Sequence, residues 1–175
     1  MSGDPKRVCL LGAESTGKTT LAEALANAYD TLWNPEYGRP YTERGRPPGR
    51  PWSTWEFTHI ARIHCWYEDF LASRCDRLLF CDTDAFTTAI FHEVYLGFTA
   101  RGFEELVARR YDAYLVCGLD VPFARDGIRE FEERRRAMHE RYLAHARESG
   151  SPWALVEGSM PDRVTTARAL VDGLP

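Results

Sequence analysis

Lysine is almost missing from this chain of 175 residues. Only Lys6 and Lys18 are lysines among its 22 basic residues, so every other basic residue is an arginine. The 26 acidic residues outnumber the basic ones, and a formal net charge of −4 provides no overall positive field for nucleic acid. We therefore predict no nucleic-acid partner. Because lysine is so rare here, a lysine inside a motif is less easily explained by chance.

Disulfide, zinc and membrane-spanning patterns are also missing. The five cysteines contain no CxxC pair, and an odd count without a secretory leader favours a reducing compartment. Cys9, Cys81 and Cys117 lie in apolar runs, where cysteine commonly behaves as a small buried hydrophobe. No apolar stretch is long enough to span a bilayer. These absences predict a cytoplasmic protein with no membrane partner, and they leave its oligomeric state open.

The most informative stretch that is present is residues 12–19, GAESTGKT. It fits the phosphate-binding pattern G-x-x-x-x-G-K-[ST], and it stands between an apolar run at 7–11 and an Ala- and Leu-rich segment that begins at Thr20. Strand, glycine loop and helix together form a cradle for a triphosphate, with Lys18 reaching the β- and γ-phosphates and the Thr19 hydroxyl on Mg²⁺. The predicted ATP-binding residues are Gly12, Glu14, Ser15, Thr16, Gly17, Lys18, Thr19 and Thr20.

Short apolar runs alternate with longer helical patterns along the rest of the chain. This alternation predicts an α/β fold of three layers, in which a five-stranded parallel sheet is covered by helices on both faces. A single P-loop kinase domain is expected over residues 1–175, with a small mobile lid at about 122–136, and the ligand at the carboxyl ends of the strands. The expected strands are 7–11, 31–35, 77–81, 113–117 and 153–157. The expected helices begin at 20 and cover about 54–73, 86–95, 102–110, 130–148 and 162–171. For the helix at 54–73, Ser53 or Thr54 offers an N-cap and Glu56 suits the first turn.

Two aspartates end the third predicted strand, where a P-loop fold places the carboxylate that holds Mg²⁺. On an extended chain, Asp82 and Asp84 would point to opposite sides, so we do not expect them to share one role. We assign Asp82 to the metal and Asp84 to the acceptor side of the cleft. The alternative for Asp84 is a structural one, in which it caps the helix that starts near Phe86.

A third carboxylate, Glu36, follows the second predicted strand and also falls at the carboxyl edge of the sheet. A carboxylate there can bind an acceptor hydroxyl and take its proton, which makes Glu36 a candidate general base beside Asp84. A solvated turn residue is the competing interpretation. Arg39, three residues further on, would pair with Glu36 or with a phosphate.

The loop at 120–129 contains Arg125 and Arg129 on either side of Gly127. Arginines on a mobile loop neutralise charge on a phosphoryl group in transfer and help to exclude water. Phe123 is either a hydrophobic anchor or a platform for a flat substrate. For the arginines at 134–136 we favour a solvated, ion-paired helix face, and for the five histidines surface or packing roles. The tryptophans at 52, 55 and 66 are either substrate platforms or, as we favour, residues of core or loop packing.

Several of these segments together resemble the ribosylnicotinamide kinase domain of NadR-type bifunctional proteins, a branch of the P-loop kinases. The matching segments occur in one order and cover nearly the whole chain: GAESTGKTTL at 12–21, EYGR at 36–39, DTD at 82–84 with Thr87 and Thr88, YLG at 95–97, and DGIR at 126–129. The loop glycines alone are unspecific. The residues Glu-Ser-Thr at 14–16, between the loop glycines, and the DGxR segment make the resemblance more specific.

The resemblance implies transfer of the ATP γ-phosphate to the 5′-hydroxyl of nicotinamide riboside, a step of NAD biosynthesis that uses ATP and Mg²⁺. It also implies that Phe123 packs on the nicotinamide ring, that Asp126 contacts the substrate, and that Ser159 lies near bound nucleotide. Family members often carry a nucleotidyl-transfer domain before the kinase region; this chain begins at the kinase strand, so we expect no adenylyltransferase activity. The alternatives are a regulatory ATPase, a kinase of another nucleoside or small alcohol, and a polynucleotide kinase.

Overall fold

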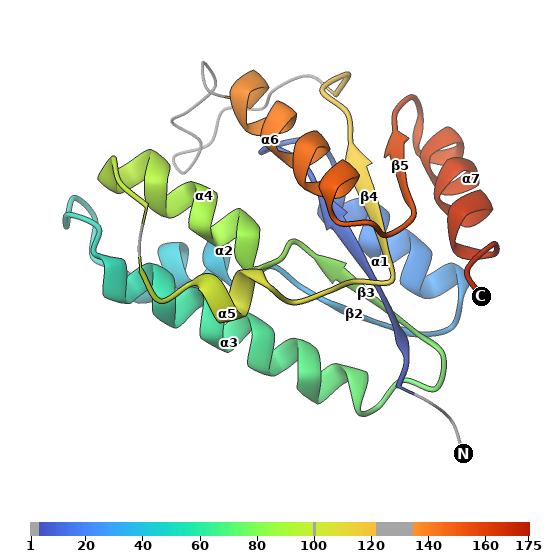
Figure 1. Cartoon of the computed structure of the whole chain (residues 1–175), viewed down its shortest axis with the longest axis horizontal. Coiled ribbons are helices and arrows are strands. Elements are labelled where there is room, and N and C mark those ends of the chain that lie inside the picture. The colour runs from blue at the N-terminus through green and yellow to red at the C-terminus, as the bar shows by residue number, and fades with distance from the viewer. Residues whose placement is uncertain (1–3, 100, 122–134) are drawn as a thin grey trace.

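A five-stranded parallel sheet forms the centre of the molecule (Figure 1). The computed structural model describes residues 4–99, 101–121 and 135–175. The strand order is β2-β3-β1-β4-β5, so the chain crosses over between neighbouring strands. The expected architecture is confirmed, and the strands are β1 Lys6–Leu11, β2 Leu32–Asn34, β3 Leu78–Asp82, β4 Ala113–Cys117 and β5 Trp153–Val156.

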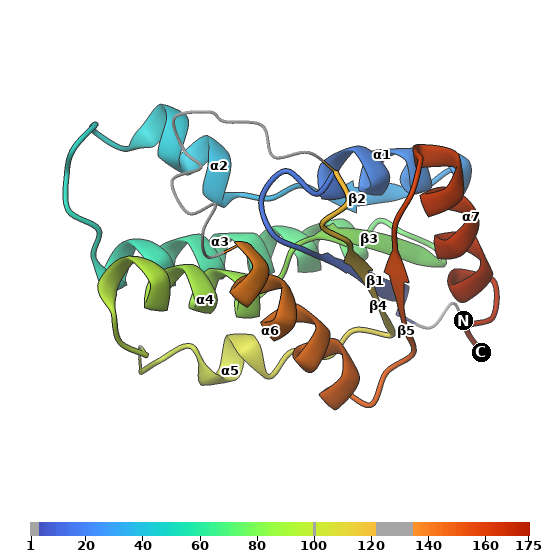
Figure 2. The ribbon, with the colours of Figure 1, turned by 90° about the horizontal axis from the view of Figure 1, so that it is seen from above.

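Helices cover both faces of this sheet (Figure 2). The face formed by the side chains of Val8 and Leu10 packs against α1 and α7, whereas Cys9 and Leu11 pack on the opposite side, against α4, α6 and the end of α3. Every one of these four side chains is fully buried, as expected for a strand covered on both faces. The helices are α1 Lys18–Ala28, α2 Gly38–Pro40, α3 Thr54–Ala72, α4 Ala85–Leu96, α5 Glu104–Val107, α6 Arg135–Glu148 and α7 Met160–Val171.

The cysteines in the apolar runs behave as predicted. Cys9, Cys81 and Cys117 are fully buried, and all five cysteine thiols are unbridged. Burial raises the pKa of the Cys117 thiol to about 12, so this side chain stays neutral and packs as a hydrophobe.

The segment between β2 and α3 contains helical structure that the sequence analysis missed. A short α2 runs directly into a π-helix, Tyr41–Gly45. The Thr42 hydroxyl donates to the Gly38 carbonyl at 2.9 Å, and the Tyr41 ring packs 5.7 Å from that of His59 on α3. Glycine and proline at its start hide the helical tendency, and the contact that holds the segment comes from a distant part of the chain.

Helix α3 begins where the capping residues predict. Ser53 and Glu56 form a capping box, and Arg46 forms an ion pair with Glu56 at 3.1 Å, both side chains being almost fully buried. Further along, Trp55 and Trp66 are 66% and 61% exposed, so core packing is wrong for these two tryptophans, whose rings stack on His59 and Phe70 at the surface of α3. No helix in the described ranges is both long and apolar enough to cross a membrane.

Candidate active site

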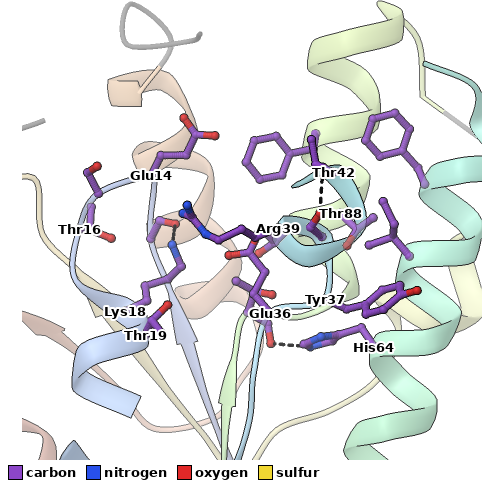
Figure 3. Close-up of a pocket in the computed structure, with 18 of the residues that line it drawn as sticks. Glu14, Thr16, Lys18, Thr19, Glu36, Tyr37, Arg39, Thr42, His64 and Thr88 are labelled. Carbon is purple, nitrogen blue, oxygen red and sulfur yellow. Dashed lines mark hydrogen bonds between the residues drawn. The ribbon is translucent and has the colours of Figure 1, made fainter. Parts of the chain in front are cut away.

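A pocket of about 370 Å³ opens at the carboxyl ends of the strands (Figure 3). One side is formed by Glu14 and Thr16 of the loop before α1 and by Lys18 and Thr19 of the first turn of that helix. The other side is formed by α3, α4 and the α2 segment. All eight residues predicted from the glycine loop line this pocket, which places them together as one site. The other lining residues are Glu36, Tyr37, Gly38, Arg39, Thr42, Trp52, Phe57, Ile60, His64, Thr83, Thr87, Thr88, Phe91, Tyr95 and Val121.

Lys18 folds back over the loop from the first turn of α1. Its Nζ donates to the carbonyl oxygens of Gly12 and Ala13, at 2.9 and 3.1 Å. The loop passes close to β4, because a Cβ atom on Gly12 would lie 2.7 Å from Thr16 Oγ1 and 3.0 Å from Cys117 Cβ. Glycine is therefore required at this position for the loop to close around a phosphate.

Two left-handed residues shape the loop. Ser15 has φ 57° and Gly17 has φ 82°, and Gly17 forms the N-cap of α1 without a side-chain cap. The first N–H groups of α1 are left to a ligand, and an anion satisfies them best. Thr16 is fully buried, and its hydroxyl donates to the Ala13 carbonyl at 2.8 Å, so this side chain stiffens the loop from within.

Asp82, at the end of β3, provides a group that fits a divalent cation. Its Oδ2 accepts a hydrogen bond from the Thr19 hydroxyl at 2.5 Å, while its buried Oδ1 has no hydrogen-bond partner among the residues described. Burial raises the pKa of Asp82, the charge on Lys18 lowers it, and the charge on Glu36 raises it further. A hydroxyl and a carboxylate with an oxygen to spare are hard oxygen donors, which is the ligand type that Mg²⁺ takes.

The two aspartates are separated by a strained residue. Thr83 has φ 77°, an outlier for a β-branched side chain, so the chain is not extended here as the sequence analysis assumed. Asp84 accepts from the Thr87 N–H at 2.8 Å and caps α4; it is 3% exposed and is not among the residues that line the pocket. The capping alternative therefore describes the contacts of Oδ1, while Oδ2 lies 3.6 Å from His145 Nε2. Any contact of Asp84 with an acceptor stays a prediction.

Glu36 and Arg39 lie between the two sides of the pocket (Figure 3). Glu36 is half-buried and approaches Gly38 so closely that a Cβ there would lie 3.4 Å from Glu36 Oε1. Arg39 Nη1, on α2, lies 3.8 Å from Oε1 of Glu43, which is four residues further on in the π-helix. Of the two candidate bases, Glu36 is the one whose carboxylate borders the cavity.

Aromatic rings that also line the pocket, here called the aromatic wall, were undervalued by sequence reasoning. Trp52 stacks on Phe57 with ring centroids 4.8 Å apart, and Tyr95 lies 5.3 Å from Trp52. His64, taken as a packing residue, also lines the cavity, and its Nε2 lies 3.3 Å from the Thr83 carbonyl oxygen. The helical spacing of Phe57, Ile60 and His64 marks one face of α3, but periodicity does not separate a face that lines a pocket from one that packs in a core.

Several predicted residues are placed elsewhere or not described. Ser159 caps α7 in a capping box with Asp162 and does not line the pocket. Arg135 is not on a solvated face as expected, because its guanidinium donates to the backbone carbonyls of Glu14 and Val121 at 3.1 and 3.0 Å. The predicted lid residues lie outside the described residues: Phe123, Arg125, Asp126 and Arg129.

Known proteins similar to this chain establish its family. The AAA domain family AAA_28 matches residues 7–163. The trifunctional NAD biosynthesis/regulator protein NadR of Salmonella typhimurium and that of Escherichia coli are each 33% identical over 128 residues, which is 71% of this chain. The matched region spans only 31% of the length of these relatives.

Solved structures give the fold independently. A NadR protein in complex with NR superposes with a TM-score of 0.74 and 20% identity, covering 96% of this chain and 50% of that one. The thymidylate kinase of Candida albicans superposes with a TM-score of 0.67 and 12% identity, covering 98% and 93%. These neighbours confirm a P-loop kinase fold, and the sequence matches confirm the resemblance to NadR proteins. The chain belongs to the AAA_28 family of AAA domains.

Proposed function

We propose that this protein is a kinase that transfers the γ-phosphate of ATP to the 5′-hydroxyl of nicotinamide riboside and so forms nicotinamide mononucleotide. The observation that carries the proposal is one cavity that is lined by a phosphate loop, by the Glu36 carboxylate and by the aromatic wall. A donor phosphate and an acceptor alcohol bound in these two halves would meet beside Glu36. The NadR relatives and the NadR structure with NR support the choice of acceptor.

The residues divide the reaction between them. Lys18 and the loop N–H groups bind the phosphates and stabilise charge on the transferring group. Glu36 accepts the proton of the 5′-hydroxyl while the oxygen of that hydroxyl forms a bond to the γ-phosphorus. The bond from the γ-phosphorus to the β–γ bridging oxygen breaks, which releases ADP. Thr19 and Asp82 would hold Mg²⁺, which neutralises charge on the phosphate oxygens. We assign Arg125 and Arg129 to the lid, where they would neutralise charge on the phosphoryl group during transfer.

The aromatic wall suits the base of the proposed acceptor. The nicotinamide ring of the riboside is flat and carries a positive charge, and such rings bind well against the faces of Trp, Tyr and Phe. Tyr95 lines the described pocket and supplies an aromatic ring, whereas the Trp52 ring beside it already stacks on Phe57 and carries the Arg46 guanidinium 3.9 Å from its centroid. The proposal also assigns Phe123 to the same contact with the nicotinamide ring. It takes magnesium as the metal and the cytoplasm as the compartment.

The decisive experiment is product analysis with Mg²⁺-ATP, with and without nicotinamide riboside. We expect ADP and nicotinamide mononucleotide in equal amounts. Parallel reactions with adenosine, thymidine and uridine test the acceptor half separately from the phosphate half. ADP formation that no nucleoside stimulates would favour a regulatory ATPase, and stimulation by a different nucleoside would replace nicotinamide riboside as the acceptor.

Glu36→Gln and Asp84→Asn together separate the two candidate bases. Glutamine at 36 keeps the size but cannot accept the proton, so kcat is expected to fall about 100-fold, within the usual range for a general base. Asparagine at 84 still caps α4, because asparagine caps as well as aspartate does, and kcat should stay within about threefold. Steady-state kinetics of both variants measure the contrast, and a larger loss at Asp84 than at Glu36 would reverse the assignment.

A further inference from the structure

Arg163 is the largest fully buried side chain of the described part of the protein, at 1% exposure, and the pocket does not include it. It lies in the first turn of α7, behind the phosphate loop. A guanidinium is costly to bury unless each of its donors is satisfied. Here Nε donates to the Gly158 carbonyl at 3.0 Å, Nη1 to the Thr16 carbonyl at 2.8 Å, and Nη2 to Asp120 Oδ1 at 2.6 Å.

The contact with Thr16 sets the orientation of one peptide group in the phosphate loop. In a trans peptide the carbonyl of one residue and the N–H of the next point in opposite directions. Arg163 holds the Thr16 carbonyl away from the pocket, so the N–H of Gly17 is directed toward the pocket that Gly17 lines. Gly17 has φ 82°, which leaves this peptide easy to turn unless something holds it.

The same guanidinium fixes the loop after β5. Asp120 Oδ2 accepts from the Gly158 N–H at 2.7 Å, and Arg163 donates to the Gly158 carbonyl, so both backbone groups of this glycine are held by one ion pair. Burial acts to raise the pKa of Asp120, but the hydrogen bonds from Gly158 and Arg163 outweigh it and keep the pKa below its ordinary value. The carboxylate is therefore charged at neutral pH and keeps Arg163 in place.

We infer that Arg163, held by Asp120, is a positioning residue of the nucleotide site: it acts through the Thr16–Gly17 peptide to direct the Gly17 N–H at a bound phosphate. Because Arg163 does not line the pocket, the inference gives it no direct contact with nucleotide or acceptor. The inference rests on one part of the proposed function, the binding of a nucleotide, and does not depend on the identity of the acceptor. Charged hydrogen bonds are the strong ones, and neutral or shorter replacements cannot make all three contacts at once.

The test measures binding of AMP-PNP with Mg²⁺ by calorimetry for Arg163→Lys, Arg163→Gln and Asp120→Asn, with Arg168→Gln as the matched control. Arg168 is an exposed arginine on the same helix, 5.6 Å from the Tyr29 ring. We expect a rise in the dissociation constant of about tenfold or more for both Arg163 variants, a smaller rise for Asp120→Asn, and no change for Arg168→Gln.

Three readouts separate positioning from a general loss of stability. The KM for ATP should rise while the KM for the acceptor stays within about twofold, the ¹⁵N–¹H signal of Gly17 should shift, and the Arg163 and Asp120 effects should be non-additive in a double-mutant cycle. Asp120 is partly exposed, so Asp120→Asn keeps the test open if an Arg163 variant fails to fold. Folded variants with unchanged AMP-PNP affinity and an unmoved Gly17 signal would overturn the inference. Failure of the unchanged protein to bind AMP-PNP would instead remove the proposed function.

Discussion

Replacing Lys18 by alanine is expected to lower kcat about 10³-fold or more, because the substitution removes the ammonium group that we assign to the transferring phosphate. Lys18 Nζ donates to the Gly12 and Ala13 carbonyls, so the ammonium lies over the loop. An ADP-release assay with Mg²⁺-ATP and nicotinamide riboside measures the effect. Circular dichroism should show an unchanged fold, since Lys18 is half-exposed and water can replace its contacts.

The chain supplies its own control for this variant. Lys6 is the only other lysine, and it begins β1, at the opposite end of the sheet from the pocket. Lys6→Ala removes the same charge and should leave kcat within about twofold, because exposed charges more than a Debye length away are screened. Near-normal turnover by Lys18→Ala, or an equal loss in both variants, would remove Lys18 from the phosphate assignment.

The parts of the fold that could be predicted are those that local pattern determines. The strands are short apolar runs buried on both faces, and the glycine loop has a fixed spacing, so both were placed to within one or two residues. The Ser53 and Glu56 capping pair likewise marked the start of α3. Each of these signals lies within a few residues of the structure that it determines, so no tertiary information is needed to interpret it.

The parts that could not be predicted depend on contacts between distant residues. Arg163 bonds to Thr16 across 147 residues of sequence, and nothing near Arg163 distinguishes it from the other arginines. The stacking of Trp52 on Phe57, and so the aromatic wall, follows from how the chain folds back onto α3. The left-handed Thr83 breaks the alternation that would have placed Asp82 and Asp84 on opposite sides. Strain of this kind runs against local propensity and is typical of functional sites.

Asp82→Asn is expected to lower kcat about 100-fold at a fixed Mg²⁺ concentration and to raise the Mg²⁺ concentration needed for half-maximal rate. An amide oxygen is a weaker ligand than a carboxylate for a hard cation. Titration of the rate with Mg²⁺ measures both effects. Asp76→Asn is the matched control, because Asp76 is exposed and precedes the same strand at its far end. An unchanged Mg²⁺ dependence in Asp82→Asn would contradict the metal assignment.

The same variant should be the more stable protein when Mg²⁺ is removed. Burial raises the pKa of Asp82, so the folded state binds this proton more tightly than the unfolded state does. The free energy of unfolding of the unchanged protein therefore falls as the pH rises from the ordinary aspartate pKa, about 4, through the raised value. Asparagine cannot ionise, so the stability advantage of Asp82→Asn should grow over that window and persist above it. Urea unfolding of both proteins in EDTA, from pH 4.5 to pH 8, measures the difference. If Mg²⁺ closes that gap for the unchanged protein and leaves the variant unaffected, the buried carboxylate is retained for the metal at the expense of stability; a gap that Mg²⁺ leaves open would mean that the cation binds elsewhere.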